Sequence, residues 1–176
     1  MTTATATIHK SLLQIDDVLL RACVGGTTEG LAMTGIAPPP VGASRLFQAT
    51  RPISVIVGLV GKNNGSMTLN LSERGMIYMV GKLVGEEPKE LDESCFDAIS
   101  EIGNMVAGRV KDLLAGSSYE MEHISVPSMV LGANYNVYYT RGMSTVSVEF
   151  ELQDIPVMHH KDRFFSTSIS LLQRLG

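Results

Sequence analysis

The chain has 176 residues, of which 44% are hydrophobic and 18% are charged, and its formal net charge at pH 7 is −4. This length and composition indicate a single soluble domain, spanning residues 1–176, with a sizeable hydrophobic core. The acidic balance and the scattered Lys and Arg residues argue against a nucleic-acid surface. Because we find no secretory signal and no apolar run beyond strand length, we expect a cytoplasmic protein without a membrane span.

The N-terminal part is predicted to be a short disordered segment, a helix and a loop. Residues 1–7 are small and polar, and the helix is predicted from Ile8 to Cys23, ending at Gly25-Gly26. The segment Thr27–Ser44, with its glycines and Pro38-Pro39-Pro40, is predicted to be a loop. The prolines stiffen this connection, and a binding site for an SH3-like partner is the less favoured alternative. The buried stripe of the helix is predicted to contain Leu12, Ile15, Leu19 and Ala22 or Cys23.

A β-hairpin and a short helix are predicted next. The strands Pro52–Val60 and Ser66–Leu71 are separated by a segment that contains Asn64-Gly65, which is a hairpin turn signal. Ser72 is a good N-cap for a helix over Glu73–Leu83, which we expect to end at Gly85.

A long helix from about Asp92 to Gly116 has two distinct faces. One face is an apolar stripe that we expect to lie on the core. The opposite face carries an Asn and a Gly at its centre, and each of these is unfavourable in a helix by about 0.5–1 kcal/mol relative to Ala. The residues of this face therefore indicate that it serves something other than helix stability. The apolar stripe consists of Cys95, Ile99, Ile102, Val106, Val110 and Leu113, and the opposite face of Asp97, Glu101, Asn104 and Gly108.

Glu101 and Asn104 are the candidate functional pair on that face. They are three residues apart, so their Cβ atoms are roughly 5–6 Å from each other on a helix. A carboxylate can bind a cation, and a neighbouring primary amide can orient a water molecule, but neither is a useful nucleophile. Gly108 lowers the helix surface one turn further on, which would let another backbone approach. The plain alternative is a solvated helix face with one tolerated Asn.

The C-terminal part is predicted to consist of strands. In the run 124–132, Pro127 is expected at the start of a strand, and further strands are expected over Asn136–Thr140, Thr145–Leu152 and Phe164–Leu172. Between the last two lies His159-His160-Lys161-Asp162. Adjacent histidines in a strand point to opposite faces, so a polar connection is favoured over a metal site there.

The order of these elements predicts an α+β fold, an antiparallel sheet with helices packed on one face. A helix followed by a hairpin occurs once in each half of the chain, at the level of element order. Both cysteines, Cys23 and Cys95, fall on apolar helix faces and are expected to be reduced core thiols.

The spacing of four residues resembles the signature of the CheC/CheX/FliY family of chemotaxis phosphatases. That signature is Asp or Ser, three residues, Glu, two residues, Asn, twenty-two residues and Pro. In this chain it reads Asp97, Glu101, Asn104 and Pro127, with every gap as in the family. The likeness extends over roughly residues 50–152 and is weak for the N-terminal helix.

The resemblance implies hydrolysis of the phosphoaspartate on a CheY-like response regulator. It assigns to Glu101 the pairing with a lysine of the regulator's active site, and to Asn104 the orientation of the attacking water. Asp97, Gly108 and Pro127 are expected to support or contact the partner. No cofactor of the chain's own is implied, because the regulator brings its own Mg²⁺. These roles fit the chemistry of an acyl phosphate. Its hydrolysis requires a positioned water and electrostatic stabilisation, and no nucleophile from the phosphatase.

One feature of the family pattern is missing. CheC-like members carry a second copy of the motif on the first helix, whereas here that helix offers Asp16 and Asp17 without Glu-x-x-Asn. A single site per chain resembles the CheX branch, whose members are dimers, so a homodimer is expected. The remaining alternative is a non-enzymatic CheX-like module that binds a response regulator or another signalling partner.

Overall fold

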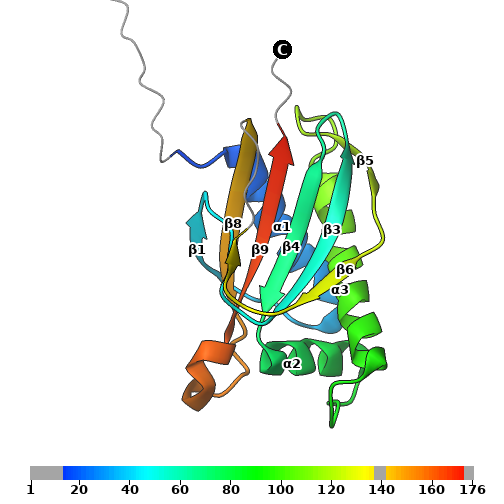
Figure 1. Cartoon of the computed structure of the whole chain (residues 1–176), viewed down its shortest axis with the longest axis vertical. Helices are drawn as coiled ribbons and strands as arrows, with labels where there is room; N and C mark the ends of the chain where they lie inside the picture. Colours follow the sequence, from blue (N-terminus) through cyan, green and yellow to red (C-terminus); the bar gives the residue numbers. More distant parts are fainter. Residues whose placement is uncertain (1–13, 137–141, 173–176) are drawn as a thin grey trace, which may run out of the picture.

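The computed structural model describes residues 14–136 and 142–172, which form a sheet covered on one face by helices. The predicted α+β class is confirmed. Figure 1 shows α1 and α3 side by side behind the sheet and α2 across its lower end, below β4. The described helices are α1 (Asp17–Gly30), α2 (Glu73–Val84) and α3 (Glu93–Leu113), with two 3₁₀ segments, η1 (Ala32–Thr34) and η2 (Val157–Asp162). The described strands are β1 (Pro40–Ser44), β2 (Gln48–Ala49), β3 (Ile53–Gly61), β4 (Gly65–Leu71), β5 (Met121–Ile124), β6 (Ser128–Leu131), β7 (Tyr135–Asn136), β8 (Met143–Glu151) and β9 (Phe164–Leu172).

The main sheet is antiparallel, and its two halves are arranged alike. Its strand order is β1-β8-β9-β4-β3-β5, with β6 also paired to β3. The hairpin β3–β4 of the first half therefore lies beside the hairpin β8–β9 of the second half, and β4 and β9 meet at the centre. Each hairpin receives an edge strand from the other half, since β1 pairs with β8 while β5 and β6 pair with β3. The predicted repeat of helix and hairpin is thus visible in the sheet.

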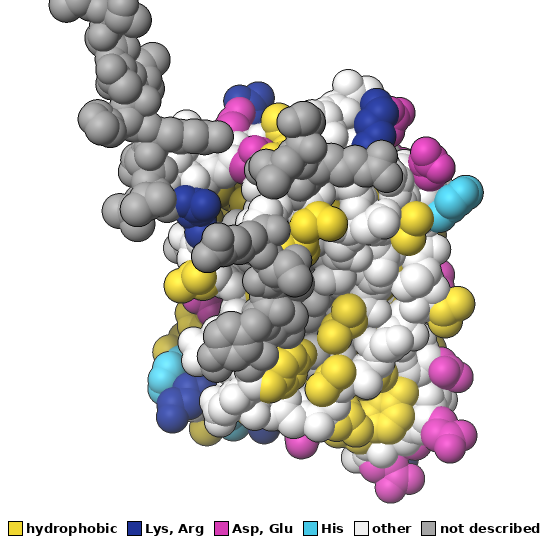
Figure 2. Space-filling view, turned by 45° about the horizontal axis from the view of Figure 1, so that its top comes forward, with side chains coloured by type: hydrophobic (Ala, Val, Ile, Leu, Met, Phe, Trp, Pro, Cys, Tyr) yellow, Lys and Arg dark blue, Asp and Glu magenta, His cyan; other side chains and the backbone are white. Residues whose placement is uncertain are grey.

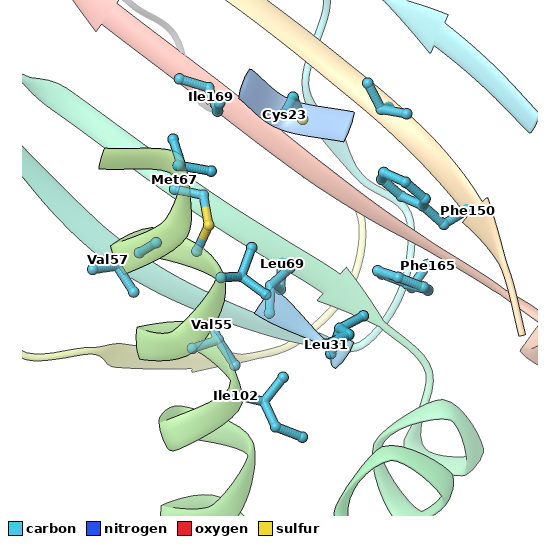
Figure 3. Packing of buried hydrophobic residues seen from close by; sticks show 14 of the residues in the cluster. Cys23, Leu31, Val55, Val57, Met67, Leu69, Ile102, Phe150, Phe165 and Ile169 are labelled. Carbon is cyan, nitrogen blue, oxygen red and sulfur yellow. The ribbon is translucent and has the colours of Figure 1, made fainter. Parts of the chain in front are cut away.

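Alternation along the strands places the core between the sheet and the helices. On β8, Val146, Val148 and Phe150 are buried as predicted, because successive side chains point to opposite faces. Figure 3 shows Phe150 and Phe165 next to each other, and their rings are stacked with centroids 5.3 Å apart. Ile102 of α3 points into the same core from the helix layer. In the view of Figure 2, most described side chains on the sheet face away from the helices are uncharged, and charged ones stand mainly at the margins.

The first helix differs most from the prediction. It begins after the N-cap Asp16, whose carboxylate accepts from Leu19 N–H at 3.0 Å, and it continues through Gly25-Gly26 to Gly30. The predicted start at Ile8 and the position of Leu12 lie outside the described residues, but the prediction of helix over residues 14–16 is wrong, because these residues precede α1. The predicted end at Gly25-Gly26 is wrong, and so is the loop over Thr27–Ser44, which contains the end of α1, η1 and β1.

The glycines of α1 serve helix packing instead of helix termination. A Cβ on Gly26 would lie 2.3 Å from Val110 Cγ2, and a Cβ on Gly30 would lie 2.7 Å from Val106 Cα. Both distances are shorter than any real contact, so the two helix backbones approach as closely as they do because these side chains are absent. Gly25 lies beside Leu113 in the same way. The predicted place of Leu113 in the buried stripe of α3 is wrong, because Leu113 is 39% exposed and Leu114 is fully buried instead.

The other predicted elements agree with the structure within a few residues. Ser72 caps α2 by accepting from Gly75 N–H at 3.1 Å, and Gly85 ends that helix with φ +91°. The hairpin β3–β4 and the strand β9 are confirmed. Pro127 directly precedes β6, so its predicted place at the start of a strand is also confirmed. Of the strand predicted over 136–140, only Asn136 in β7 falls within the described residues.

The helix contact leads to a stability prediction for Gly30→Ala. The methyl group meets the Val106 backbone, which cannot rotate away, so the cost of overpacking should lie in the upper part of the usual range of about 1–3 kcal/mol. This cost exceeds the roughly 1 kcal/mol that Ala gains in helix propensity. We expect the free energy of unfolding, measured by urea titration, to fall by about 1–2 kcal/mol. Arg21→Ala is the control, because the Arg21 side chain is 79% exposed. An unfolding curve for Gly30→Ala that coincides with wild type would contradict the close contact.

Candidate functional site

The orientation of α3 is fixed by its buried side. Ile99, Ile102, Val106 and Val110 have no exposed surface, and a Cβ on Gly103 would lie 2.7 Å from Val55 Cγ1 of β3. The helix therefore lies with its backbone close to the sheet along this side and against α1 through Val106 and Val110. The opposite side is left to solvent, so its side chains are presented in a fixed direction.

The start of α3 is also well defined. Asp92 caps the helix, because its carboxylate accepts hydrogen bonds from the Ser94 hydroxyl at 2.6 Å and from Cys95 N–H at 3.0 Å. These two hydrogen bonds, that of Ser94 first, hold the pKa of the Asp92 carboxyl below its usual range. A carboxylate at this position also compensates the partial positive charge of the helix N-terminus.

Glu101 and Asn104 lie together on the solvent side, as their spacing predicts. Asn104 Nδ2 donates to Glu101 Oε2 at 3.4 Å, a long hydrogen bond that leaves most of the hydrogen-bonding capacity of both groups unused. Glu101 is exposed and Asn104 is half-buried. Among the described residues, no Lys, Arg or His forms an ion pair with Glu101. The carboxylate is therefore available to a cation from outside the chain.

The nearest cation on the helix, Arg109, is already engaged. It binds Glu29 of α1 and lies 3.7 Å from Asp112 Oδ2. Asp97, one turn before Glu101, is exposed on the same face and adds a second negative charge. This face of α3 therefore suits a cationic group and a polar group such as water, in adjacent positions.

Pro127 belongs to a different part of the molecule, the connection between β5 and β6. Both of these strands contact α3. The connection is held by Ser125, whose N–H donates to Gly58 O at 2.9 Å and whose hydroxyl accepts from Gly58 N–H at 2.8 Å. The adjacent Val126 is 85% exposed. This Ser125–Gly58 link was not predicted from the sequence, because a glycine opposite a serine across 67 residues leaves no local pattern.

The first helix presents a similar face with different chemistry. From Asp17 to Gly30, the sequence of buried, half-buried and exposed positions matches that of Asp97 to Val110 at every position but one. In this correspondence Arg21 occupies the position of Glu101, and Val24 occupies the position of Asn104. The Arg21 guanidinium forms an ion pair with Asp17 at 2.7 Å. The structure therefore repeats the shape of the site on α1 without its carboxylate and amide.

Metal and thiol chemistry find no support in the described part of the chain. Within residues 14–136 and 142–172, no three His, Cys, Asp or Glu side chains lie close enough together to hold a metal ion, and this includes His159 and His160, which lie in η2. Both cysteines are free and buried, and burial raises the pKa of the Cys23 thiol to about 12. No helix among the described residues is long and apolar enough to span a membrane.

The fold of the chain is that of CheC-like proteins. A CheC-like superfamily protein from Shewanella sp. PV-4 is similar over 89% of this chain and 99% of its own, with a TM-score of 0.73 and 21% identity. A CheX–CheY–BeF₃–Mg²⁺ complex from Borrelia burgdorferi contains a chain that is similar over 91% of this chain and 100% of its own, with a TM-score of 0.67 and 22% identity. At these identities the likeness establishes the fold.

The sequence comparisons define the family. The family model described as Chemotaxis phosphatase CheX matches residues 53–151, which include α3, Glu101, Asn104 and Pro127. The CheY-P phosphatase CheX of Thermotoga maritima is 27% identical over 127 residues, which cover 70% of this chain and 81% of that protein. The chain belongs to the CheX family of chemotaxis phosphatases.

Because Glu101 and Asn104 lie on the solvent side of α3, we expect their side chains to contribute nothing to the free energy of unfolding. We expect Asn104→Ala to leave the free energy of unfolding unchanged or to raise it by about 0.5 kcal/mol, because Ala is the better helix former. Ile102→Ala, two residues away on the buried side, should lower it by about 2–5 kcal/mol. Urea unfolding of the two variants measures both values. A loss above about 1 kcal/mol for Asn104→Ala would assign the amide a structural role instead.

Proposed function

We propose that this chain is a phosphatase that hydrolyses the phosphoaspartate of a CheY-like response regulator. The observation that carries the proposal is the Glu101–Asn104 pair, which lies on the solvent side of a packed helix, lacks a described cationic partner and lies inside the segment that matches the CheX family. The similar protein of Thermotoga maritima is described as a CheY-P phosphatase, and the similar chain of Borrelia burgdorferi is in a complex with CheY.

In the proposed mechanism the pair works inside the regulator's active site. The Glu101 carboxylate pairs with the active-site lysine of the regulator and thereby fixes the position of α3. The Asn104 side-chain amide then holds a water molecule in line with the bond between phosphorus and the aspartyl oxygen. The water oxygen attacks phosphorus, the bond to the aspartyl oxygen breaks, and the products are inorganic phosphate and the free Asp carboxylate.

This mechanism requires little from the phosphatase because the substrate is an acyl phosphate. The leaving group is a carboxylate, which departs without a proton, and the regulator supplies the Mg²⁺ that neutralises charge on the phosphoryl oxygens. What remains is positioning of the water, which a fixed amide can provide. Asp97 extends the acidic face toward the regulator, and Pro127 shapes the adjacent connection between β5 and β6.

Two further features belong to the proposal. The chain carries one Glu-x-x-Asn pair, on α3, as expected for a CheX-like member, so we propose that it acts as a homodimer in the cytoplasm. Since Arg21 and Val24 occupy the corresponding positions on α1, that face would repel the regulator's lysine and lacks the amide, and only one site per chain is proposed.

Loss of phosphate from a phosphorylated CheY-like regulator tests the proposal. We expect wild type to accelerate it, and Asn104→Ala to lower the rate by about 10²-fold or more while binding of the regulator is retained. Glu101→Ala should weaken binding as well, because the pairing with the lysine is lost. Arg21→Ala, at the corresponding position on α1, is the matched control and should behave as wild type.

Other outcomes of this experiment would reject the proposal. If wild type binds a regulator but does not accelerate the loss of phosphate, the chain is a non-enzymatic binding module of the CheX family. If Asn104→Ala is as active as wild type, the amide does not orient the attacking water.

A further inference from the structure

Gly108 is a glycine inside α3 that nothing within the chain explains. Glycine is the poorest helix former after proline, so its presence in a helix interior normally has a packing reason. A Cβ built on Gly108 meets no atom of residues 14–136 and 142–172 within 4 Å. Its backbone is helical, so no left-handed φ requires glycine either.

All other glycines within the described helices have a neighbour that a Cβ would contact. Gly26 and Gly30 allow α1 to pack on α3, and Gly103 allows α3 to pack on β3. The remaining ones would meet an atom at distances between 2.9 and 3.4 Å: Leu113 Cδ1 for Gly25, Ser72 Oγ for Gly75 and Glu87 Cα for Gly81. Among these positions Gly108 alone faces open space, so its neighbour is to be sought outside the chain.

The place of Gly108 on the helix connects it with the candidate site. It follows Asn104 by four residues, which is about 6 Å along the helix axis and about 40° around it, toward the side of Glu101. It is half-buried at the base of the same face, while Glu101 is exposed. A partner that engages the pair and extends one turn further along α3 would therefore lie over Gly108.

We infer that Gly108 is a clearance position, at which the backbone of the bound response regulator comes into contact with α3. The missing Cβ determines how far Asn104 can enter the regulator's active site. This inference rests on the proposed function and adds to it a residue that controls the depth of engagement. Since carbon atoms in contact are separated by about 3.5–4.0 Å, a methyl group at this position would push a backbone on the Gly108 Cα outward by roughly 1 Å or more.

We expect such a displacement to slow the hydrolysis strongly, without disrupting the fold of the chain. A misplacement of about 1 Å between a positioned group and the reacting atoms costs on the order of 10²-fold in rate. Among the described residues, by contrast, a Cβ at Gly108 has free space, and both Ala and Leu are better helix formers than Gly. The rate of phosphate loss is therefore predicted to fall, whereas the stability of the fold is predicted to stay the same or to rise.

The test compares Gly108→Ala and Gly108→Leu with wild type. We expect the unfolding midpoint to stay the same or to rise by roughly 2–4 °C. The value of kcat/KM for loss of phosphate from the regulator should fall by about 10²-fold for Ala and at least as much for Leu. The Ala variant should lose mainly kcat, because it still binds, and the Leu variant should also bind the beryllofluoride-activated regulator more weakly. Thr28→Leu, at the corresponding position on α1, is the matched control and should leave kcat/KM and binding of the regulator unchanged.

The outcomes separate this inference from the proposed function. If wild type is active and Gly108→Leu is equally active, the clearance role is wrong and the proposed function stands. If wild type binds the regulator without hydrolysis, the phosphatase proposal falls, and weaker binding by Gly108→Leu still supports the contact. If wild type neither binds nor acts on a regulator, both are overturned. If Gly108→Leu instead changes the sedimentation coefficient, a second copy of the chain covers this position and the inference is overturned.

Discussion

The close contact between α1 and α3 is the constraint on which the rest of the molecule depends. Gly26 and Gly30 bring the backbone of α1 against Val106 and Val110 of α3, and Gly103 brings α3 against the sheet. With two of its sides occupied, α3 has no freedom to rotate, so its remaining side presents Glu101 and Asn104 in one direction. A site on a packed helix is held more precisely than a site on a loop, and that precision is what positioning a water molecule requires.

The structure also shows how a nearly symmetric scaffold carries a site on one side only. The strand order places the hairpin of each half next to the other, and α1 and α3 have nearly the same pattern of burial. Their exposed faces nevertheless differ, with Arg21 and Val24 on one and Glu101 and Asn104 on the other. The buried positions are determined by packing, which both halves share, whereas the exposed positions are free to differ in chemistry.

Much of this could be predicted from the sequence because the signals are local. The cap Ser72, the Asn64-Gly65 turn and the alternation along β8 each act within a few residues, and all were interpreted correctly or nearly so. Gly25-Gly26 was misread because a glycine pair is an ordinary helix end, and only the partner helix, about 80 residues away, shows that it serves a contact. The edge strand β1, which was predicted as part of a loop, depends on pairing with β8 of the other half of the chain, and such pairing leaves no local pattern. The positions of Glu101 and Asn104 followed from helix periodicity, but the roles assigned to them remain predictions.

The proposed mechanism depends on the pairing of Glu101 with the active-site lysine of a response regulator, which requires α3 to enter the regulator's active site. A double-mutant cycle measures this directly, with Glu101→Gln in this chain, a Lys→Met change in the regulator, and the Kd of the beryllofluoride-activated regulator as the readout. If Glu101 pairs with this lysine, we expect a coupling free energy of at least about 1.5 kcal/mol between the two changes, as is typical of close charge pairs across an interface. A coupling below about 0.5 kcal/mol, within the additivity of distant sites, would contradict the pairing and with it the placement of the pair in the regulator's active site.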